Sequence, residues 1–153
     1  MDIKPAAAQI LATGDGEALS FLNDSVMTLK LSDDSAGPAF YEYRCPPAAT
    51  AAPPHVHHGH DETFYVVEGS FEFAVGYNLR VLGPGGFVFV PRETPHAFRN
   101  AGASAGRIVG TLTPGHFAQY FRELALIIDA TGQPPAKAQW AELYARYDTT
   151  FAD

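Results

Sequence analysis

Residues 53–62 of this 153-residue chain read Pro53-Pro54-His55-Val56-His57-His58-Gly59-His60-Asp61-Glu62. Four of the six histidines of the chain lie in this stretch, and two carboxylates follow them at once. The two prolines hold the backbone extended into His55. Because side chains alternate along a strand, His55 and His57 are expected to point to the same face, and Glu62 begins the next strand. The stretch therefore predicts a cluster of metal-binding side chains on an inner strand face.

A fifth histidine, His96, follows the turn at residues 91–95 and begins a later predicted strand. Three imidazoles and one carboxylate that converge from three strands can hold a divalent cation and leave positions open for water or substrate. We expect His55, His57, Glu62 and His96 to bind one transition-metal ion. Fe, Mn, Ni, Co and Zn all accept this donor set, so the identity of the metal stays open.

Short strands separated by turn residues recur along the middle of the chain at the spacing typical of β-sandwiches and barrels. The predicted strands are residues 26–31, 40–44, 62–67, 71–75, 79–82, 87–90, 96–99 and 107–112. The segment from 87 to 90 is entirely apolar. This pattern predicts an all-β domain.

The hydrophobic period changes from two to 3.6 residues after residue 112. A first helix is expected to begin at Thr113-Pro114-Gly115 and to end at Thr131-Gly132, and a second to begin at Pro134-Pro135. The chain therefore divides into an N-terminal arm (residues 1–23, with a short strand near Ile10-Leu11), a β-barrel (residues 24–113) and C-terminal helices (residues 114–153). We expect these helices to pack on the barrel.

The composition argues against several classes of function. The formal net charge is −7 and the ten basic residues are scattered, which disfavours nucleic acids and anionic membranes as partners. No apolar run approaches the ~20 residues that span a bilayer, and residues 1–8 lack the apolar core of a signal peptide. The single cysteine, Cys45, excludes an internal disulfide and is interpreted as a small apolar residue. A cytoplasmic location is expected.

The histidine spacing resembles the two motifs of the cupin superfamily, and in particular the small monocupins of the quercetin 2,3-dioxygenase-like group. The first motif is present as His55-Val56-His57, Glu62 and Gly69, and the second as Gly85, Pro91, His96 and Asn100. The likeness extends over roughly residues 24–125 and includes the segments Phe-Tyr-Val-Val-Glu-Gly (residues 64–69) and Thr-Pro-His-Ala-Phe-Arg-Asn (residues 94–100). It implies a double-stranded β-helix, or jelly-roll barrel, followed by two α-helices.

Several positions depart from the cupin pattern or lie outside it. Glu93 stands where the second motif has a glycine, so a turn that needs positive φ would carry a strain of about 1 kcal/mol. Ala49 replaces the leading glycine of the first motif. His58 and His60 are not motif ligands and are expected on the solvent side; the alternative is that they support the ligands or bind an accessory metal. His116 is expected on the surface.

The resemblance also implies a reaction. An acidic hydroxyl of a flavonol-like substrate, or of another enol or phenol, would bind the metal, Glu62 would act as ligand and general base, and dioxygen would attack the activated ring. Each apolar or aromatic side chain predicted to line the pocket has an ordinary core position as its alternative. These candidates are Met27, Tyr41, Tyr43, Phe64, Val66, Phe73, Phe89 and Phe98.

Two other functions stay open. A non-catalytic metal-containing cupin could bind a small molecule as a sensor or carrier. A sugar isomerase or epimerase is disfavoured, because Arg99 and Arg107 are the only basic candidates near the pocket.

A DNA-binding regulator is disfavoured by the acidic charge and by the lack of a helix-turn-helix before the barrel. A homodimer is expected, since a small barrel exposes edge strands that a partner can cover.

Overall fold

The computed structural model describes residues 7–32, 36–47, 49 and 52–153. Eleven strands form two sheets among these residues. The six-stranded sheet has the order β1 (Glu17–Ser20), β2 (Val26–Leu31), β3 (Ala39–Cys45), β10 (Gly106–Thr113), β5 (Asp61–Glu68) and β8 (Phe87–Val90). The five-stranded sheet has the order β11 (Thr149–Phe151), β4 (His55–His57), β9 (His96–Asn100), β6 (Phe71–Val75) and β7 (Asn78–Leu82).

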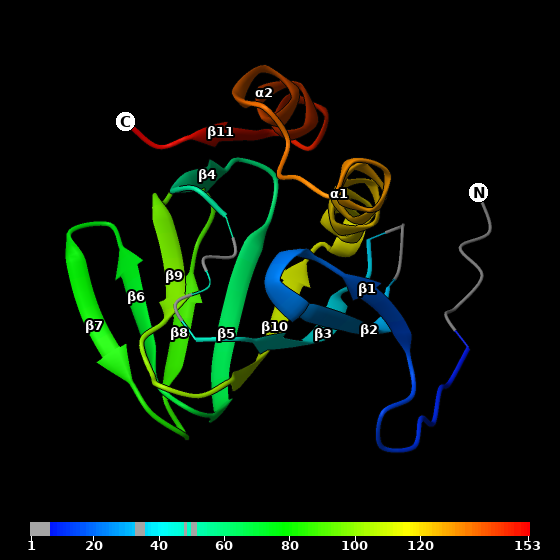
Figure 1. Cartoon of the computed structure of the whole chain (residues 1–153), viewed down its shortest axis with the longest axis vertical. Helices are drawn as coiled ribbons and strands as arrows, with labels where there is room; N and C mark the ends of the chain where they lie inside the picture. Colours follow the sequence, from blue (N-terminus) through cyan, green and yellow to red (C-terminus); the bar gives the residue numbers. More distant parts are fainter. Residues whose placement is uncertain (1–6, 33–35, 48, 50–51) are drawn as a thin grey trace.

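All neighbouring strands are antiparallel, and the two sheets face each other as the layers of a jelly-roll sandwich (Figure 1). The predicted all-β jelly-roll architecture with two C-terminal helices is confirmed. The described strands form two separate sheets, and the molecule is therefore a sandwich and not a closed barrel.

The core lies between the sheets and follows from strand alternation. Along β3, for example, Ala39, Tyr41, Tyr43 and Cys45 are buried and the residues between them are more exposed. Cys45 is fully buried, as its interpretation as an apolar residue requires. Each fully buried large apolar side chain contributes about 1.5–3 kcal/mol relative to an exposed one, so the inner faces supply most of the driving force for folding.

Asn100 explains the last position of the second motif. Its side-chain amide donates to the carbonyls of Cys45 (2.8 Å) and Ser104 (2.9 Å), and its Oδ1 accepts from the N–H of Gly102 (2.8 Å). Three hydrogen bonds satisfy a side chain that is 1% exposed. Asn100 therefore ties the end of β9, in one sheet, to the end of β3, in the other.

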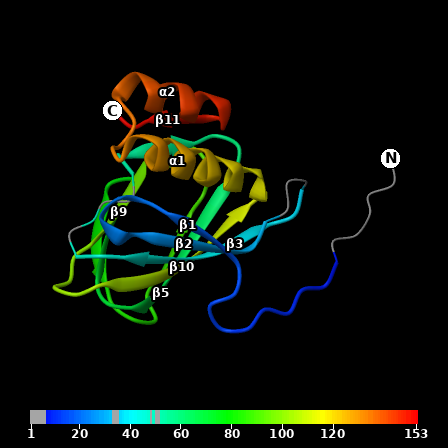
Figure 2. The ribbon, with the colours of Figure 1, turned by 45° about the vertical axis from the view of Figure 1, so that its right-hand side comes forward.

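The C-terminal segment lies over one end of the sandwich (Figures 1 and 2). A short 3₁₀ turn, η2 (Gly115–Phe117), precedes α1 (Ala118–Thr131), and α2 (Lys137–Arg146) follows. Gly132 adopts φ 65° and its N–H bonds the carbonyl of Ile128 at 2.7 Å, which ends α1 where the sequence predicted. Neither described helix is long and apolar enough to cross a membrane.

The N-terminal segment differs from its prediction. Ile10 and Leu11 are exposed and lie outside any strand. The strand is instead β1, which pairs with β2 from Glu17↔Leu29 to Ser20↔Val26. A second 3₁₀ turn, η1 (Leu22–Asp24), connects β1 and β2. The apolar pair at 10–11 has no facing strand, whereas residues 17–20 extend the six-stranded sheet.

Candidate metal centre and cavity

The four predicted ligands come together between the two sheets. One ligand atom from each of His55, His57, Glu62 and His96 lies within 4.8 Å of all the others. His57, Glu62 and His96 are at most 5% exposed, and His55 is half-buried. Strand pairing produces this cluster, because β4 pairs with β9 at His55↔His96 and β5 faces them from the other sheet.

Two of the imidazoles are oriented by backbone carbonyls. His55 Nδ1 lies 2.7 Å from the carbonyl oxygen of Pro53, and His96 Nδ1 lies 2.9 Å from that of Thr94. A carbonyl oxygen can only accept, so each Nδ1 carries the hydrogen. In the neutral imidazole, Nε2 then has a free lone pair, and it points into the cluster.

His57 is oriented by the last strand. Its Nδ1 lies 3.0 Å from Thr149 Oγ1, and this hydroxyl donates its hydrogen to the carbonyl of Tyr147 at 3.0 Å. Thr149 therefore accepts from His57 Nδ1, which leaves Nε2 free in this ring as well. Thr149 could not be predicted from the sequence, because a threonine 92 positions from its partner carries no local signal.

The donor set fits a cation. His55 Nε2 and His57 Nε2 are 3.1 Å apart, and Glu62 Oε2 is 3.2 Å from Nε2 of both His57 and His96. Burial, and then the neighbouring imidazoles, lower the pKa of His55 to about 3; burial also lowers the pKa of His57. Neutral imidazoles that turn their lone pairs toward one another and toward a carboxylate repel unless a positive ion lies among them.

Glu62 is held on its second oxygen by Tyr41, whose hydroxyl donates to Oε1 at 2.9 Å. Burial alone would raise the pKa of Glu62, but hydrogen bonds from His57 and His96 outweigh it and hold the pKa well below its usual range when their Nε2 atoms carry hydrogens; a cation among the free lone pairs would lower it in the same direction. The ring of Tyr41 lies over Gly110 of β10, where an added Cβ would be 2.1 Å from the ring. Glycine at this position therefore makes room for the residue that orients Glu62.

His58 and His60 behave differently from each other. His58 turns away from the cluster, as predicted, and its ring nitrogens lie 2.8 Å from Glu93 Oε2 and 3.0 Å from Thr150 Oγ1. The prediction for His60 was wrong, because His60 is fully buried against the rings of His57 (4.1 Å) and Phe117 (4.5 Å). Its surroundings come from η2, far away in the sequence. His116, expected on the surface, is half-buried and has its ring 6.0 Å from that of His60.

Glu93 has the positive φ that the motif glycine would adopt, at 68°. Its N–H donates to the carbonyl of His57 at 2.7 Å, and its carboxylate faces His58. The left-handed backbone therefore ties the turn before His96 to the end of β4. The strain that a non-glycine residue carries is balanced by contacts that keep the two histidine strands together.

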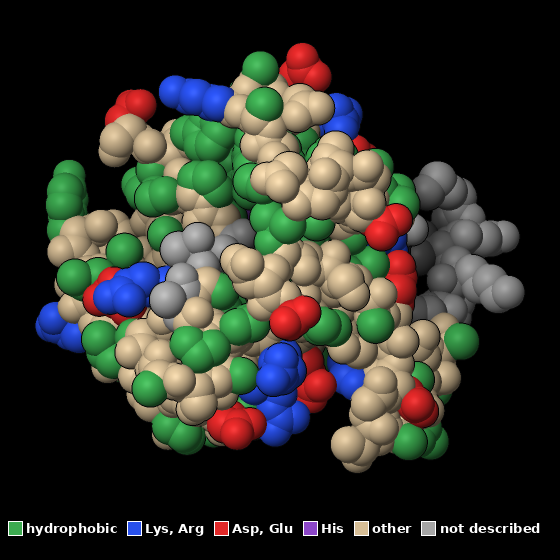
Figure 3. All heavy atoms as spheres, viewed as in Figure 1, with side chains coloured by type: hydrophobic (Ala, Val, Ile, Leu, Met, Phe, Trp, Pro, Cys, Tyr) green, Lys and Arg blue, Asp and Glu red, His purple; other side chains and the backbone are tan. Residues whose placement is uncertain are grey.

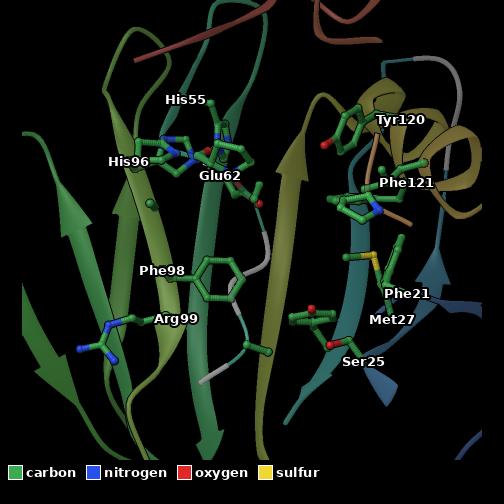
Figure 4. Close-up of a pocket in the computed structure, with 18 of the residues that line it drawn as sticks. Phe21, Ser25, Met27, His55, Glu62, His96, Phe98, Arg99, Tyr120 and Phe121 are labelled. Carbon is green, nitrogen blue, oxygen red and sulfur yellow. Dashed lines mark hydrogen bonds and ion pairs between the residues drawn. The ribbon is translucent and has the colours of Figure 1, made fainter. Parts of the chain in front are cut away.

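A cavity of about 570 Å³ opens beside the four ligands (Figure 4). This is within the range of sites that hold a drug-sized molecule. Of the predicted pocket residues, Met27, Tyr41, Tyr43, Phe64 and Phe98 line it.

Three predicted pocket residues do not line the cavity. Val66 and Phe73 are buried core residues, and Phe73 packs against Phe64 and Phe98. Phe89 was assigned to the wrong face of its strand: it is 53% exposed, and Val90 is the buried residue of β8. An all-apolar strand has no polar residue to mark its outer face, so its alternation could not be read from the sequence.

The opposite wall of the cavity is formed by α1 and α2. Tyr120, Phe121 and Leu124 reach it from α1, and Trp140 and Tyr144 from α2. The helical period after residue 112 predicts apolar helix faces here but does not place them in the pocket. Helical periodicity indicates which side is buried and not what it is buried against.

The model of the Cupin domain family matches residues 41–111. A segment of 70 residues is 39% identical to quercetin 2,3-dioxygenase of Bacillus subtilis (strain 168). This match covers 46% of the chain and 20% of that protein, so it spans about a fifth of the length of the curated relative.

Solved structures share the fold. KdgF from Halomonas sp. has a TM-score of 0.63 at 18% identity, over 71% of this chain and 94% of that one. A predicted oxalate decarboxylase from Thermotoga maritima has a TM-score of 0.60 at 17% identity, over 69% and 99%. TT1209 from Thermus thermophilus has a TM-score of 0.51 at 30% identity, over 57% and 83%. The first two identities are low enough that they speak for the fold alone.

Proposed function

Because residues 41–111 of this chain form a cupin domain, we propose that the protein is a metal-dependent dioxygenase that acts on a flavonol-like aromatic compound with an acidic enol or phenol hydroxyl. The observation that carries the proposal is the position of the three-histidine, one-glutamate cluster at the wall of a cavity lined by aromatic side chains. The partial match to a quercetin 2,3-dioxygenase supports the same reaction class.

In this proposal, four residues hold the metal and one of them also accepts a proton. His55, His57, Glu62 and His96 would hold one divalent transition metal, which supplies Lewis acidity toward a bound hydroxyl and access to dioxygen. Glu62 accepts the proton of that hydroxyl, and Tyr41 keeps the carboxylate in place through its bond to Oε1.

The cavity binds the planar ring system and excludes water from it. Phe64 and Phe98, whose ring centroids are 5.1 Å apart, present aromatic surface from the two sheets. Phe121 closes the opposite side from α1 and packs edge-on against Tyr41 at 5.6 Å. A flat aromatic molecule gains more from such walls than a sugar would, because the walls bury apolar area and offer few hydrogen bonds.

Neither basic residue considered for a sugar isomerase is available to bind a substrate phosphate in the cavity. Arg99 is bound to Glu72 at 2.7 Å, and Arg107 lies 3.9 Å from Glu42 and does not line the cavity. On the face seen in Figure 3, lysine and arginine side chains stand apart among acidic and apolar ones. A sugar phosphate needs a cluster of cations, and the described part of the cavity offers Arg99 alone, already paired.

The test is oxygen uptake. The purified protein, reconstituted separately with Fe(II), Mn(II) and Ni(II), is titrated with quercetin without oxygen and then exposed to air, with His96→Ala as the control. We expect quercetin binding and oxygen consumption in at least one metal form and none in the control. Binding without oxygen uptake in every form would identify a non-catalytic binding protein, which is the alternative function.

A further inference from the structure

Three buried hydrogen-bond donors on the helical wall of the cavity have no partner among the described residues. They are the hydroxyls of Tyr120 and Tyr144 and the indole N–H of Trp140. Tyr120 and Tyr144 are 2% and 1% exposed, and all three residues line the cavity. Buried donors are nearly always satisfied in folded proteins, so three of them on one wall require an explanation.

The three groups lie close to one another and to the ligand cluster. The rings of Tyr120 and Tyr144 stack at 5.6 Å, Trp140 meets Tyr144 edge-on at 6.1 Å, and Tyr144 lies 5.6 Å from the ring of His55. Figure 4 shows the Tyr120 hydroxyl directed toward the side of the cavity where His96 and Glu62 lie. The three groups affect one another's pKa through weak hydrogen-bond contacts, but these contacts do not meet the geometry that would satisfy any of the three donors.

All three groups donate at neutral pH. Burial raises the pKa of Tyr144 to about 12, against a smaller opposite effect of the nearby Trp140 N–H, and burial raises the pKa of Tyr120 well above its usual range. Both hydroxyls therefore keep their protons. The indole N–H of Trp140 can only donate. Each tyrosine oxygen can also accept, but none of the three groups has a hydrogen-bond partner among the described residues, and three unsatisfied donors on one wall can bind a carbonyl, hydroxyl or phenolate oxygen.

We propose that Tyr120, Trp140 and Tyr144 bind an acceptor oxygen of the aromatic substrate and so determine which substrates the cavity accepts. For the class of substrate this rests on the proposed function. The site selects a planar molecule with two oxygen groups, one directed to the three-histidine cluster and the other to the helical wall. The donors belong to α1 and α2, beyond residues 41–111, so this selection comes from the helices and not from the cupin domain.

The chain provides its own probe, because Trp140 is its only tryptophan. Quercetin is titrated without oxygen into the protein as purified, and binding is followed by quenching of Trp140 fluorescence. The variants are Tyr120→Phe, Tyr144→Phe and the double variant. The control is Tyr147→Phe, because the Tyr147 hydroxyl bonds the carboxylate of Glu123 and the residue does not line the cavity.

We expect the dissociation constant for quercetin to rise about fivefold in each single variant and further in the double variant, with Tyr147→Phe unchanged; because the two rings are in contact, the two effects need not multiply. Metal content should not change, and thermal stability should stay equal or increase, because each variant removes an unpaired buried hydroxyl. A purely structural role for the tyrosines would lower stability instead.

Unchanged quercetin affinity in the double variant would overturn the proposal, and so would an equal loss in Tyr147→Phe. A wild-type protein that does not bind quercetin would overturn the assigned ligand class. Tight, tyrosine-dependent binding without oxygen uptake would refute the dioxygenase and leave this inference standing. Oxygen uptake together with unchanged quercetin affinity in the tyrosine variants would support the dioxygenase and overturn this inference.

Discussion

The two sides of the cavity differ in whether their polar atoms have hydrogen-bond partners within the protein. At the β4–β5–β9 side, each ligand histidine has its Nδ1 held by a fixed acceptor, and Glu62 is held by Tyr41. At the α1–α2 wall, three donors are buried without a partner among the described residues. The first arrangement prepares a site before anything binds. The second leaves the wall unsatisfied until a molecule with an acceptor arrives. The strands would therefore hold the ion, and in our proposal the helices discriminate among substrates.

The largest expected effect is on metal binding by His96→Ala. Removing one of four buried ligands should reduce the metal content from about one ion per chain to near zero, measured by elemental analysis of protein purified without added metal. His58→Ala is the matched control, since His58 faces Glu93 and Thr150 instead of the cluster. Full metal content in His96→Ala would show that the ligand set is wrong.

Gly110→Ala should disturb the hydrogen bond from Tyr41 that orients Glu62. The added methyl group overlaps the Tyr41 ring and must displace it, at a cost of about 3 kcal/mol in the free energy of unfolding. Denaturant unfolding measures this loss, and metal affinity should fall with it because Tyr41 no longer orients Glu62. Gly83→Ala, which meets nothing within 4 Å, should stay within about 0.5 kcal/mol of wild type. Equal stability of the two variants would contradict the packing described for Tyr41.

Thr149→Val tests whether β11 prepares the metal site. Losing the acceptor for His57 Nδ1 should weaken metal binding about 10- to 100-fold, measured by competition with a chelator. Thr150→Val is next to it in the same strand, loses the bond to His58 instead, and should bind metal as the wild type does. If both variants bind equally well, the orientation of His57 does not depend on the last strand.

His60 is the exception on the strand side, and it provides the smallest effect. Both of its ring nitrogens are buried without a partner among the described residues. His60→Leu should therefore stabilise the chelator-treated protein by about 1 kcal/mol in thermal unfolding. His58→Leu, which removes bonds to Glu93 and Thr150, should give no gain. A destabilised His60→Leu would mean that the ring has a polar role beside His57.

The sequence predicted more of the strand side than of the helical wall. Turn residues and alternation placed eight of the eleven described strands within one position at each end, and the paired motifs identified all four members of the metal cluster. Strand β1 was predicted too early in the chain, near Ile10 and Leu11. Phe89 and His60 were misplaced, because each depends on which neighbour arrives from elsewhere in the chain. Strand β11 was missed, since three residues are too few to show a period.

The spacing of His55, His57, Glu62 and His96 was determined by the sequence alone, because strand alternation is a local property that fixes which side chains share a face. The tertiary structure decided what surrounds them. It brought Thr149 to His57, placed Tyr41 over Gly110, buried His60 under η2 and set three unpaired donors opposite the cluster. These contacts join residues far apart in the chain, and no local period encodes them.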